Sequence, residues 1–238
     1  MDRCEKYRKY LTKEDLMGPN AFRLLDELLR RSPYGECRGR VLDLGCGNAL
    51  TSVFAANETP LKSVYAFDLW IPADDNLKRI REANLEEKVI PIHGDAMDMP
   101  FAKDWFDTVI SMDSYHYFGC EKGVFGEKIL PVVKKGGQVM IAVPGLKKEP
   151  EGDMRTLFET WAEGDDAKTF KTVSWWENLL TEECGDTCDI SVTEAECCDK
   201  AWEEWFATGH EYALRDREYL SQGLYDYLNF VFMYVRKR

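Results

Sequence analysis

The 238-residue sequence lacks several features that would define its class of protein. It has no apolar run near the roughly 20 residues that cross a bilayer. Its charged start, MDRCEKYRKYLTKED, has no apolar core of the kind found in signal peptides. It also lacks a basic excess, because 43 acidic residues against 31 Lys and Arg give a net charge of −12. Nucleic acids and anionic membranes require clustered positive charge, so we expect neither as a partner. Since the sequence shows no membrane span and no signal peptide, we expect a cytoplasmic location.

Metal-binding cysteine pairs are also lacking, since the eight cysteines include no CxxC motif. Four cysteines fall late in the chain, at Cys184, Cys188, Cys197 and Cys198. Their spacing matches no familiar zinc pattern, and adjacent Cys197 and Cys198 would point to opposite faces of a strand. We expect free thiols in a reducing compartment and no bound metal.

From residue 40 onward, apolar strand-like runs alternate with segments of helical spacing. The predicted strands are RVLDLG, SVYAFDL, KVIPIHGDA, FDTVISMDS and GQVMIAVPG, and the helices between them are ALTSVFAANE, ADDNLKRIREANL and a helix through KGVFGEKILPVV. This alternation predicts an α/β fold, with a parallel sheet covered by helices on both faces.

The flanking segments have a different texture. Residues 1–31 have the apolar spacing of a helix, broken by Gly18-Pro19. Residues 146–185 are polar and helical, and Ser174 and Glu177 resemble a capping box at a helix start. The late runs DISVTEAEC and LNFVFMYVRKR predict two strands that form an antiparallel hairpin at the edge of the sheet.

We therefore predict one domain over residues 1–238. It divides into an N-terminal helical segment (1–35), a cofactor-binding core (36–145), a helical cap (146–185) and closing strands with a helical insertion (186–238).

Glycines and acids follow the first four predicted strands. Gly45-Cys46-Gly47 comes after the first strand, Asp68 after the second, Asp95 after the third and Asp113 after the fourth. The carboxyl ends of parallel strands open into one crevice, so these residues should converge. Glycine lets a ligand approach the backbone closely, and an acid after the second strand can accept hydrogen bonds from ribose hydroxyls. The pattern indicates a nucleoside-containing ligand.

A dinucleotide fingerprint would carry a third glycine near position 50, where Leu50 stands. The third glycine allows the helix to pack tightly behind a pyrophosphate. The absence of this glycine disfavours an NAD-dependent oxidoreductase. The sequence also lacks the catalytic Ser/Tyr-Lys set and the zinc ligands that such enzymes use.

Taken together, five segments resemble the successive motifs of class I S-adenosylmethionine-dependent methyltransferases. They are VLDLGCGNAL, VYAFDLW, PIHGDAMDMPF, FDTVISMDSYHYFG and LPVVKKGGQVMIAVPG, and LMGPNAFRLLDELL is similar to the N-terminal helix of bacterial and archaeal small-molecule members. The resemblance implies a Rossmann-like, doubly wound, seven-stranded, mostly parallel sheet. Its last strand would be antiparallel, with a helical N-terminal segment and helical cap insertions. The sequence departs from the family at Asn48-Ala49-Leu50, where Thr-Gly is common.

The resemblance implies S-adenosylmethionine as the cofactor and a set of residues that contact it. The set is Tyr10, Gly18, Asp43, Gly45, Cys46, Gly47, Asp68, Leu69, Trp70, Asp95, Ala96, Ser111, Met112 and Asp113. Within it, Asp68 would hold the ribose diol and Asp95 would accept from the adenine amine. The loop 45–47 and residues 111–113 would lie along the methionine moiety, supported by Asp43, with Tyr10 and Gly18 closing over it.

The methyl acceptor has fewer candidate contacts. We predict catalytic roles for His116 and Asp113, because an imidazole just past the fourth strand can remove a proton from a hydroxyl, thiol or amine. The alternative is that His116 only packs between Tyr115 and Tyr117. Aromatic residues in 146–185 and 200–227 either bind an apolar or cationic acceptor or simply pack the helices. The negative net charge favours a neutral or cationic acceptor.

The predicted function is transfer of a methyl group to a small molecule. A non-catalytic protein that binds S-adenosylmethionine or S-adenosylhomocysteine stays open, because no motif requires turnover. A protein methyltransferase also stays open. No N-P-P-Y-like tetrapeptide stands at Asp113-Ser114-Tyr115-His116, which counts against methylation of bases or glutamine.

Overall fold

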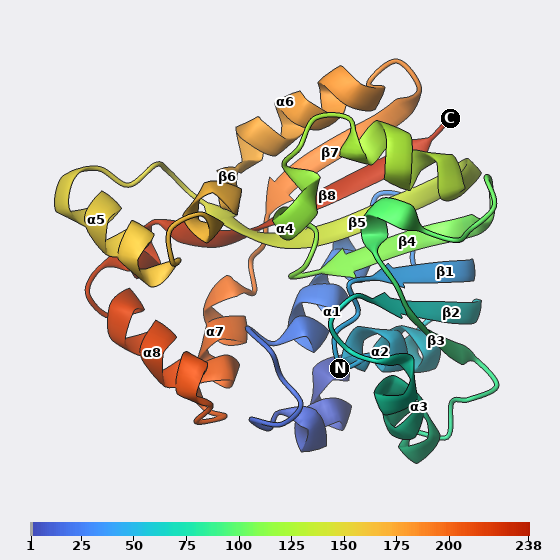
Figure 1. The fold of residues 1–238 in the computed structure, drawn as a ribbon, viewed down its shortest axis with the longest axis horizontal. Helices are drawn as coiled ribbons and strands as arrows, with labels where there is room; N and C mark the ends of the chain where they lie inside the picture. Colours follow the sequence, from blue (N-terminus) through green and yellow to red (C-terminus); the bar gives the residue numbers. More distant parts are fainter. Residues whose placement is uncertain (1) are drawn as a thin grey trace.

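A computed structural model describes residues 2–238, and one mixed sheet runs through it in the order β3-β2-β1-β4-β5-β8-β7 (Figure 1). The parallel strands are β1 (Gly39–Leu44), β2 (Leu61–Asp68), β3 (Val89–His93), β4 (Phe106–Met112) and β5 (Val133–Leu146). Strand β8 (Leu228–Lys237) runs antiparallel to both β5 and β7 (Cys188–Glu194). The predicted mostly parallel, doubly wound sheet with an antiparallel last strand is confirmed. A two-residue strand, β6 (Lys171–Thr172), pairs with the end of β5.

The core has two layers, one on each face of the sheet. In β8, Phe230 and Phe232 pack into one layer while Val231 and Met233 pack into the other. This strict alternation is what a strand buried on both faces requires. Helices α1 (Ala21–Arg31), α2 (Leu50–Glu58) and α3 (Ala73–Glu82) cover the first face, and α4 (His116–Gly119) and α6 (Val173–Cys184) cover the second (Figure 1).

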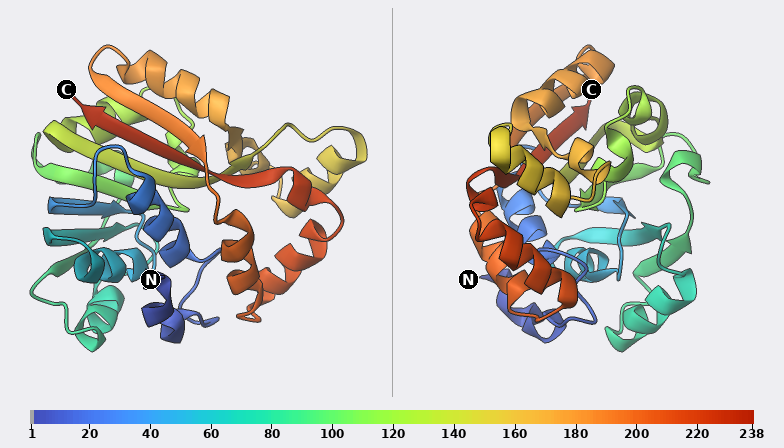
Figure 2. Two further views of the ribbon diagram at one scale, coloured as in Figure 1. Left: turned by 180° about the vertical axis from the view of Figure 1, so that it is seen from behind. Right: turned by 60° about the vertical axis from the view of Figure 1, so that its left-hand side comes forward.

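The later helices form a lobe beyond the carboxyl ends of the parallel strands. It contains α5 (Gly152–Trp161), α7 (Cys198–Phe206) and α8 (Glu211–Leu220), and we call it the helical lobe (Figures 1 and 2). The N-terminal segment lies beside α7 and completes this end of the molecule (Figure 2). In residues 2–238 the structure contains no helix with the length and apolar character needed to span a bilayer.

The predicted helix over 1–31 is only partly correct, and residue 1 lies outside the described residues. A 3-10 helix spans Arg3–Tyr10, an irregular segment follows, and α1 begins only at Ala21. Gly18-Pro19 interrupts the helix, and the Asn20 side chain caps the new start by accepting from the Phe22 and Arg23 N–H groups. The predicted helix through KGVFGEKILPVV is likewise split, into a π-helical turn at Phe125–Ile129 and a 3-10 turn at Leu130–Val132.

The predicted capping box at Ser174 and Glu177 is wrong. Helix α6 begins at Val173, and its N-cap is Thr172, whose hydroxyl accepts from the Trp175 N–H at 3.3 Å. Thr172 pairs with Leu146 in the short β6 strand, which holds its backbone extended with φ −76° and ψ 163°. The cap therefore falls where the strand ends, and Ser174 lies within the first helical turn.

Candidate functional site

The loop after β1 packs closely against the segment that follows β4. Gly45 and Gly47 have φ values of +73° and +51°, and a Cβ on Gly45 would lie 1.8 Å from Ser114 Oγ. The N–H groups of Gly45 and Cys46 both donate to the Phe67 carbonyl, which ties the loop to β2. Ala49, in the departure from the family pattern, has φ +58°. The loop therefore keeps a glycine-like left-handed turn even where alanine replaces glycine.

Asp68 joins the ends of β1 and β2. Its Oδ2 accepts from the Gly47 N–H at 2.7 Å, and its Oδ1 accepts from the Trp70 and Ile71 N–H groups at 2.7 and 2.8 Å. The side chain is nearly fully buried, yet it still lines the cleft described below. Oδ2 can accept one further hydrogen bond, so Asp68 retains acceptor capacity for a ligand hydroxyl.

Asp43 and Ser111 lie beneath the loop and do not line the cleft. Asp43 is fully buried and accepts from the Thr51 and Ser52 hydroxyls at 2.7 and 2.6 Å. Burial raises the pKa of Asp43 to about 6. Ser111 is fully buried within β4. Both residues can support the loop from behind, but neither is positioned to touch a ligand.

Three hollows follow one another along the carboxyl ends of the strands. The loop hollow, about 120 Å³, lies against Gly45–Gly47, and the edge hollow, about 210 Å³, lies against Leu69, Asp95 and Ala96. The lobe cavity, about 420 Å³, lies under the helical lobe. Asp68 lines the loop and edge hollows, and Asp113 lines the loop hollow and the lobe cavity. Since Trp70 and Tyr117 line all three, the hollows form one continuous cleft.

Large apolar side chains remain exposed around this cleft. Trp70 is 62% exposed, Tyr117 is 48% exposed, and their ring centroids lie 5.3 Å apart. Met17, Leu69 and Tyr212 are also more than half exposed and line the same hollows. Exposed apolar groups gathered at one concave surface indicate that a ligand covers them.

Asp113 lies where the loop hollow meets the lobe cavity. It has φ +53°, its N–H donates to the Ala142 carbonyl at 2.8 Å, and its carboxyl group has no hydrogen-bond partner among residues 2–238. Burial, and next the negative charge of Asp216, raise the pKa of Asp113 to about 7. Gly18 fits against this carboxyl, since a Cβ on Gly18 would lie 2.5 Å from Asp113 Oδ2. The structure thus brings Gly18 and Asp113 together, with Met112 and Cys46 also lining the loop hollow.

His116 lines the lobe cavity at the start of α4. It is 3% exposed, and its Nδ1 has no hydrogen-bond partner within the described residues. Its ring packs 4.0 Å from the Tyr117 ring and 6.0 Å from the Phe170 ring, measured between centroids. Burial lowers the pKa of His116 to about 3, so the imidazole is neutral near pH 7.

The lobe cavity is walled by aromatic rings around a carboxylate that the sequence analysis missed. Asp216 on α8 accepts from the indole N–H groups of Trp161 and Trp205, both at 2.8 Å. Trp202 and Tyr212 also line the cavity, as the aromatic pattern suggested. In the sequence, Asp216 reads as one charge on an exposed helix face, and no local signal distinguishes it.

Other sequence candidates lie away from the cleft. Tyr10 stacks near Tyr7 and packs against Phe22, over α2, so the structure does not bring it to the cofactor cleft. Trp176 is fully buried in the core layer below α6.

The Gly18-Pro19-Asn20 segment closes the cleft from the N-terminal side. Besides capping α1, Asn20 donates through Nδ2 to Glu204 on α7 at 2.6 Å. Arg23 donates to both carboxylate oxygens of Glu204, at 2.7 and 2.5 Å. This contact fixes the N-terminal segment against the helical lobe, so both walls of the cleft are held together.

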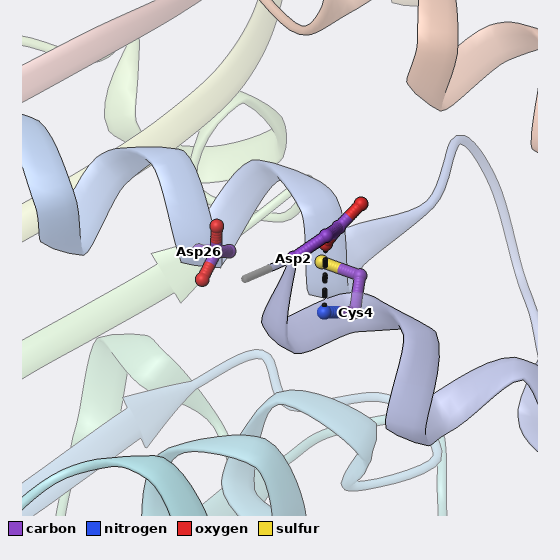
Figure 3. Close-up of side chains that lie close together, drawn as sticks. All are labelled: Asp2, Cys4 and Asp26. Carbon is purple, nitrogen blue, oxygen red and sulfur yellow. Dashed lines mark hydrogen bonds between the residues drawn. The ribbon is translucent and has the colours of Figure 1, made fainter.

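Asp2, Cys4 and Asp26 form the one group of potential metal ligands among residues 2–238 (Figure 3). The Asp26 oxygens accept from Arg3 Nε at 2.5 Å and Arg30 Nε at 2.9 Å, and Asp2 accepts from the Cys4 N–H at 2.9 Å. Burial raises the pKa of the Cys4 thiol to about 12. Because guanidinium groups already neutralise Asp26, the group links the N-terminal segment to α1 and does not resemble a metal centre.

Sequence comparison identifies the core. Residues 41–137 match a family model described as a methyltransferase domain. The chain is similar to 27-O-demethylrifamycin SV methyltransferase of Amycolatopsis mediterranei (strain S699), with 25% identity over 132 residues. That alignment covers 55% of this chain and 47% of the relative, so the chain matches less than half the length of that protein.

Solved structures agree with the fold. Phosphoethanolamine N-methyltransferase 2 of Haemonchus contortus, in complex with S-adenosylmethionine, superposes with a TM-score of 0.72 at 20% identity, over 93% of this chain and 54% of that chain. A methyltransferase of Geobacter sulfurreducens, in complex with S-adenosylhomocysteine, superposes with a TM-score of 0.67 at 17% identity, over 98% of both chains. The predicted resemblance to class I S-adenosylmethionine-dependent methyltransferases is therefore confirmed over residues 41–137, and the solved structures agree with its fold.

Proposed function

We propose that the protein is an S-adenosylmethionine-dependent methyltransferase that acts on a small molecule. The observation that carries this proposal is the continuous cleft at the carboxyl ends of β1, β2 and β4, lined along its whole length by Trp70 and Tyr117. Ligands of open α/β sheets bind at this edge. The methyltransferase domain match over 41–137 covers the core loops that line it, those after β1, β2, β3 and β4.

The residues present fit the cofactor. Gly45 and Gly47 line the loop hollow, where the methionine half of the ligand would bind. Asp68, between the loop and edge hollows, suits a ribose diol. Asp95 and Ala96 line the edge hollow, where an adenine would bind. When bound, the cofactor supplies an electrophilic methyl group on a sulfonium sulfur.

The protein's own contribution is to align the acceptor and to take up a proton. Asp113 lies between the two proposed ligand sites, and its pKa near 7 suits a base that works at neutral pH. His116, with a pKa lowered to about 3, is a much weaker base. We therefore assign proton uptake to Asp113 and alignment of the acceptor to the neutral ring of His116.

The proposed acceptor is a small molecule because the cavity of about 420 Å³ is of the size that binds small ligands. We also propose a cytoplasmic location, supported by the eight cysteines, all of which are free. The four sequence segments within 1–238 are proposed to act as one domain, since the N-terminal segment and the helical lobe share the cleft with the core.

Transfer of a labelled methyl group from S-adenosylmethionine to a mixture of small-molecule extracts tests the proposal. Label should move to a small-molecule fraction with the wild-type protein, and should fall strongly with Asp113→Asn. His116→Ala should bind S-adenosylhomocysteine with unchanged affinity but turn over more slowly. Binding of the cofactor without transfer to any fraction would instead favour the non-catalytic binding protein.

A further inference from the structure

Acidic side chains outnumber basic ones around the lobe cavity. Asp113, Glu163, Asp166 and Asp216 line it, against one cation, Arg215. Arg215 is already engaged, because its Nη1 lies 2.7 Å from Glu163 and its Nη2 donates to a carbonyl at the end of α5 at 2.7 Å. The other three carboxylates have no salt-bridge partner among residues 2–238.

Two neutral donors orient the Asp216 carboxylate. Its two hydrogen bonds come from the indole N–H groups of Trp161 and Trp205, at 2.8 Å each. An indole donor is neutral, so it orients a carboxylate but does not compensate its charge. Asp216 therefore presents an oriented carboxyl group to the cavity, and burial raises the pKa of this group.

Aromatic rings supply the rest of the wall. They include Trp70, Tyr117, Trp161, Trp202, Trp205 and Tyr212. The faces of such rings attract cations, most strongly where water is excluded. For an anion, these side chains offer only the N–H of an indole or the O–H of a phenol as hydrogen-bond donors. Carboxylates set among aromatic faces are the chemistry that recognises an ammonium group.

We propose that the lobe cavity binds a small amine in its protonated form, so that the methyl acceptor of the function proposed above is an amine nitrogen. Asp216 and the aromatic rings hold the ammonium group. Asp113 then takes one proton from it: an N–H bond breaks, an O–H bond forms on the carboxylate, and the lone pair stays on nitrogen. The methylation of an amine rests on the proposed function, whereas the binding of a cation in the lobe cavity does not.

Calorimetric titration with a matched pair of probes tests the charge preference. Choline carries a quaternary ammonium group, and 3,3-dimethylbutan-1-ol is its neutral carbon isostere. Each is titrated into the protein alone and into the protein saturated with S-adenosylhomocysteine. We expect choline to bind at least about tenfold more tightly than the isostere, since desolvated cation–π contacts and one charge pair supply this much.

Variants assign the preference to the cavity. Asp216→Asn should lower choline affinity by about tenfold while leaving the isostere unchanged. Glu218→Gln removes the same charge from an exposed position on α8 and should change neither. Equal affinities of the two probes, undetectable choline binding at millimolar concentration, or tighter binding of 3,3-dimethylbutanoate would overturn the inference. Failure to bind S-adenosylhomocysteine would contradict the proposed function, and the titration of the protein alone would still decide the charge preference.

Discussion

At the scale of single residues, the cleft depends on backbone conformations that most side chains avoid. Gly45, Gly47, Ala49 and Asp113 all have positive φ. The glycines could be predicted from the sequence because G-x-G stands together with acids at three further strand ends, and these acids could be predicted to converge from the sheet topology. Asp216 could not, because its role depends on two tryptophans from other helices reaching the same carboxylate.

Gly45→Ala should both destabilise the fold and abolish cofactor binding. A Cβ there would lie 1.8 Å from Ser114 Oγ and 2.5 Å from Ser114 Cβ, so the backbone must move. We expect a loss of roughly 2–4 kcal/mol in the free energy of unfolding, combining a left-handed backbone penalty with overpacking. Urea denaturation measures the loss.

Gly136→Ala is the matched control, because Gly136 also has positive φ (+75°) but no atom within 4 Å of an added Cβ. It should lose only the backbone term, about 1 kcal/mol. Equal losses in the free energy of unfolding would mean that the close contact with Ser114 does not constrain Gly45.

Asp113→Asn should make the protein more stable at high pH. The folded-state pKa of Asp113, about 7, is raised above its ordinary value of 3.8, so the folded state favours the protonated acid. Protonated Asp113 makes its full contribution to the free energy of unfolding below about pH 4, and this contribution is lost as the pH rises to about 7. Asparagine does not ionise, so the variant should gain on the order of 2 kcal/mol over wild type at pH 8 for a partly hydrated site.

Denaturation curves at pH 5 and pH 8 check this. The advantage of Asp113→Asn should be smaller at pH 5, and the exposed-loop control Asp186→Asn should show no such pH dependence. A variant that is less stable than wild type at pH 8 would mean that Asp113 is charged and favourably paired in the folded protein.

At the scale of elements, strands were predicted well and helix starts less well. Each central strand is apolar on both faces, so its signal lies within a few neighbouring residues. The start of α6 depends instead on the pairing of Thr172 with Leu146, a contact that no local pattern records. Similarly, α1 starts late because Asn20 caps it and also binds Glu204, far along the chain.

Thr172→Ala should therefore lower stability by about 1 kcal/mol, the usual value of an N-cap hydroxyl. Ser174→Ala should have an effect of only a few tenths of that, because Ser174 lies inside the helix at an exposed position. Thermal unfolding of both variants makes the comparison. A larger loss for Ser174→Ala would restore the capping box that the sequence suggested.

At the scale of the whole molecule, the cleft is assembled from three parts of the chain. The core supplies the loops after β1, β2 and β4, the N-terminal segment supplies Met17–Pro19, and the helical lobe supplies Asp216 with its tryptophans. The core, and the binding of a ligand at the carboxyl ends of its strands, could be predicted from the order of the sequence motifs. The lobe cavity could not, since its charge arises only when α5, α7 and α8 pack against one another.

The central claim is that this cleft binds S-adenosylmethionine with Asp68 at its middle. Titration of S-adenosylhomocysteine into wild type and Asp68→Ala, followed by calorimetry, tests it most directly. The account predicts binding to wild type and a loss of about tenfold or more in Asp68→Ala, because a buried ligand diol loses its charged acceptor. Asp74→Ala, at an exposed position on α3, should bind as wild type does. No binding to wild type, or equal affinity in Asp68→Ala, would contradict the account.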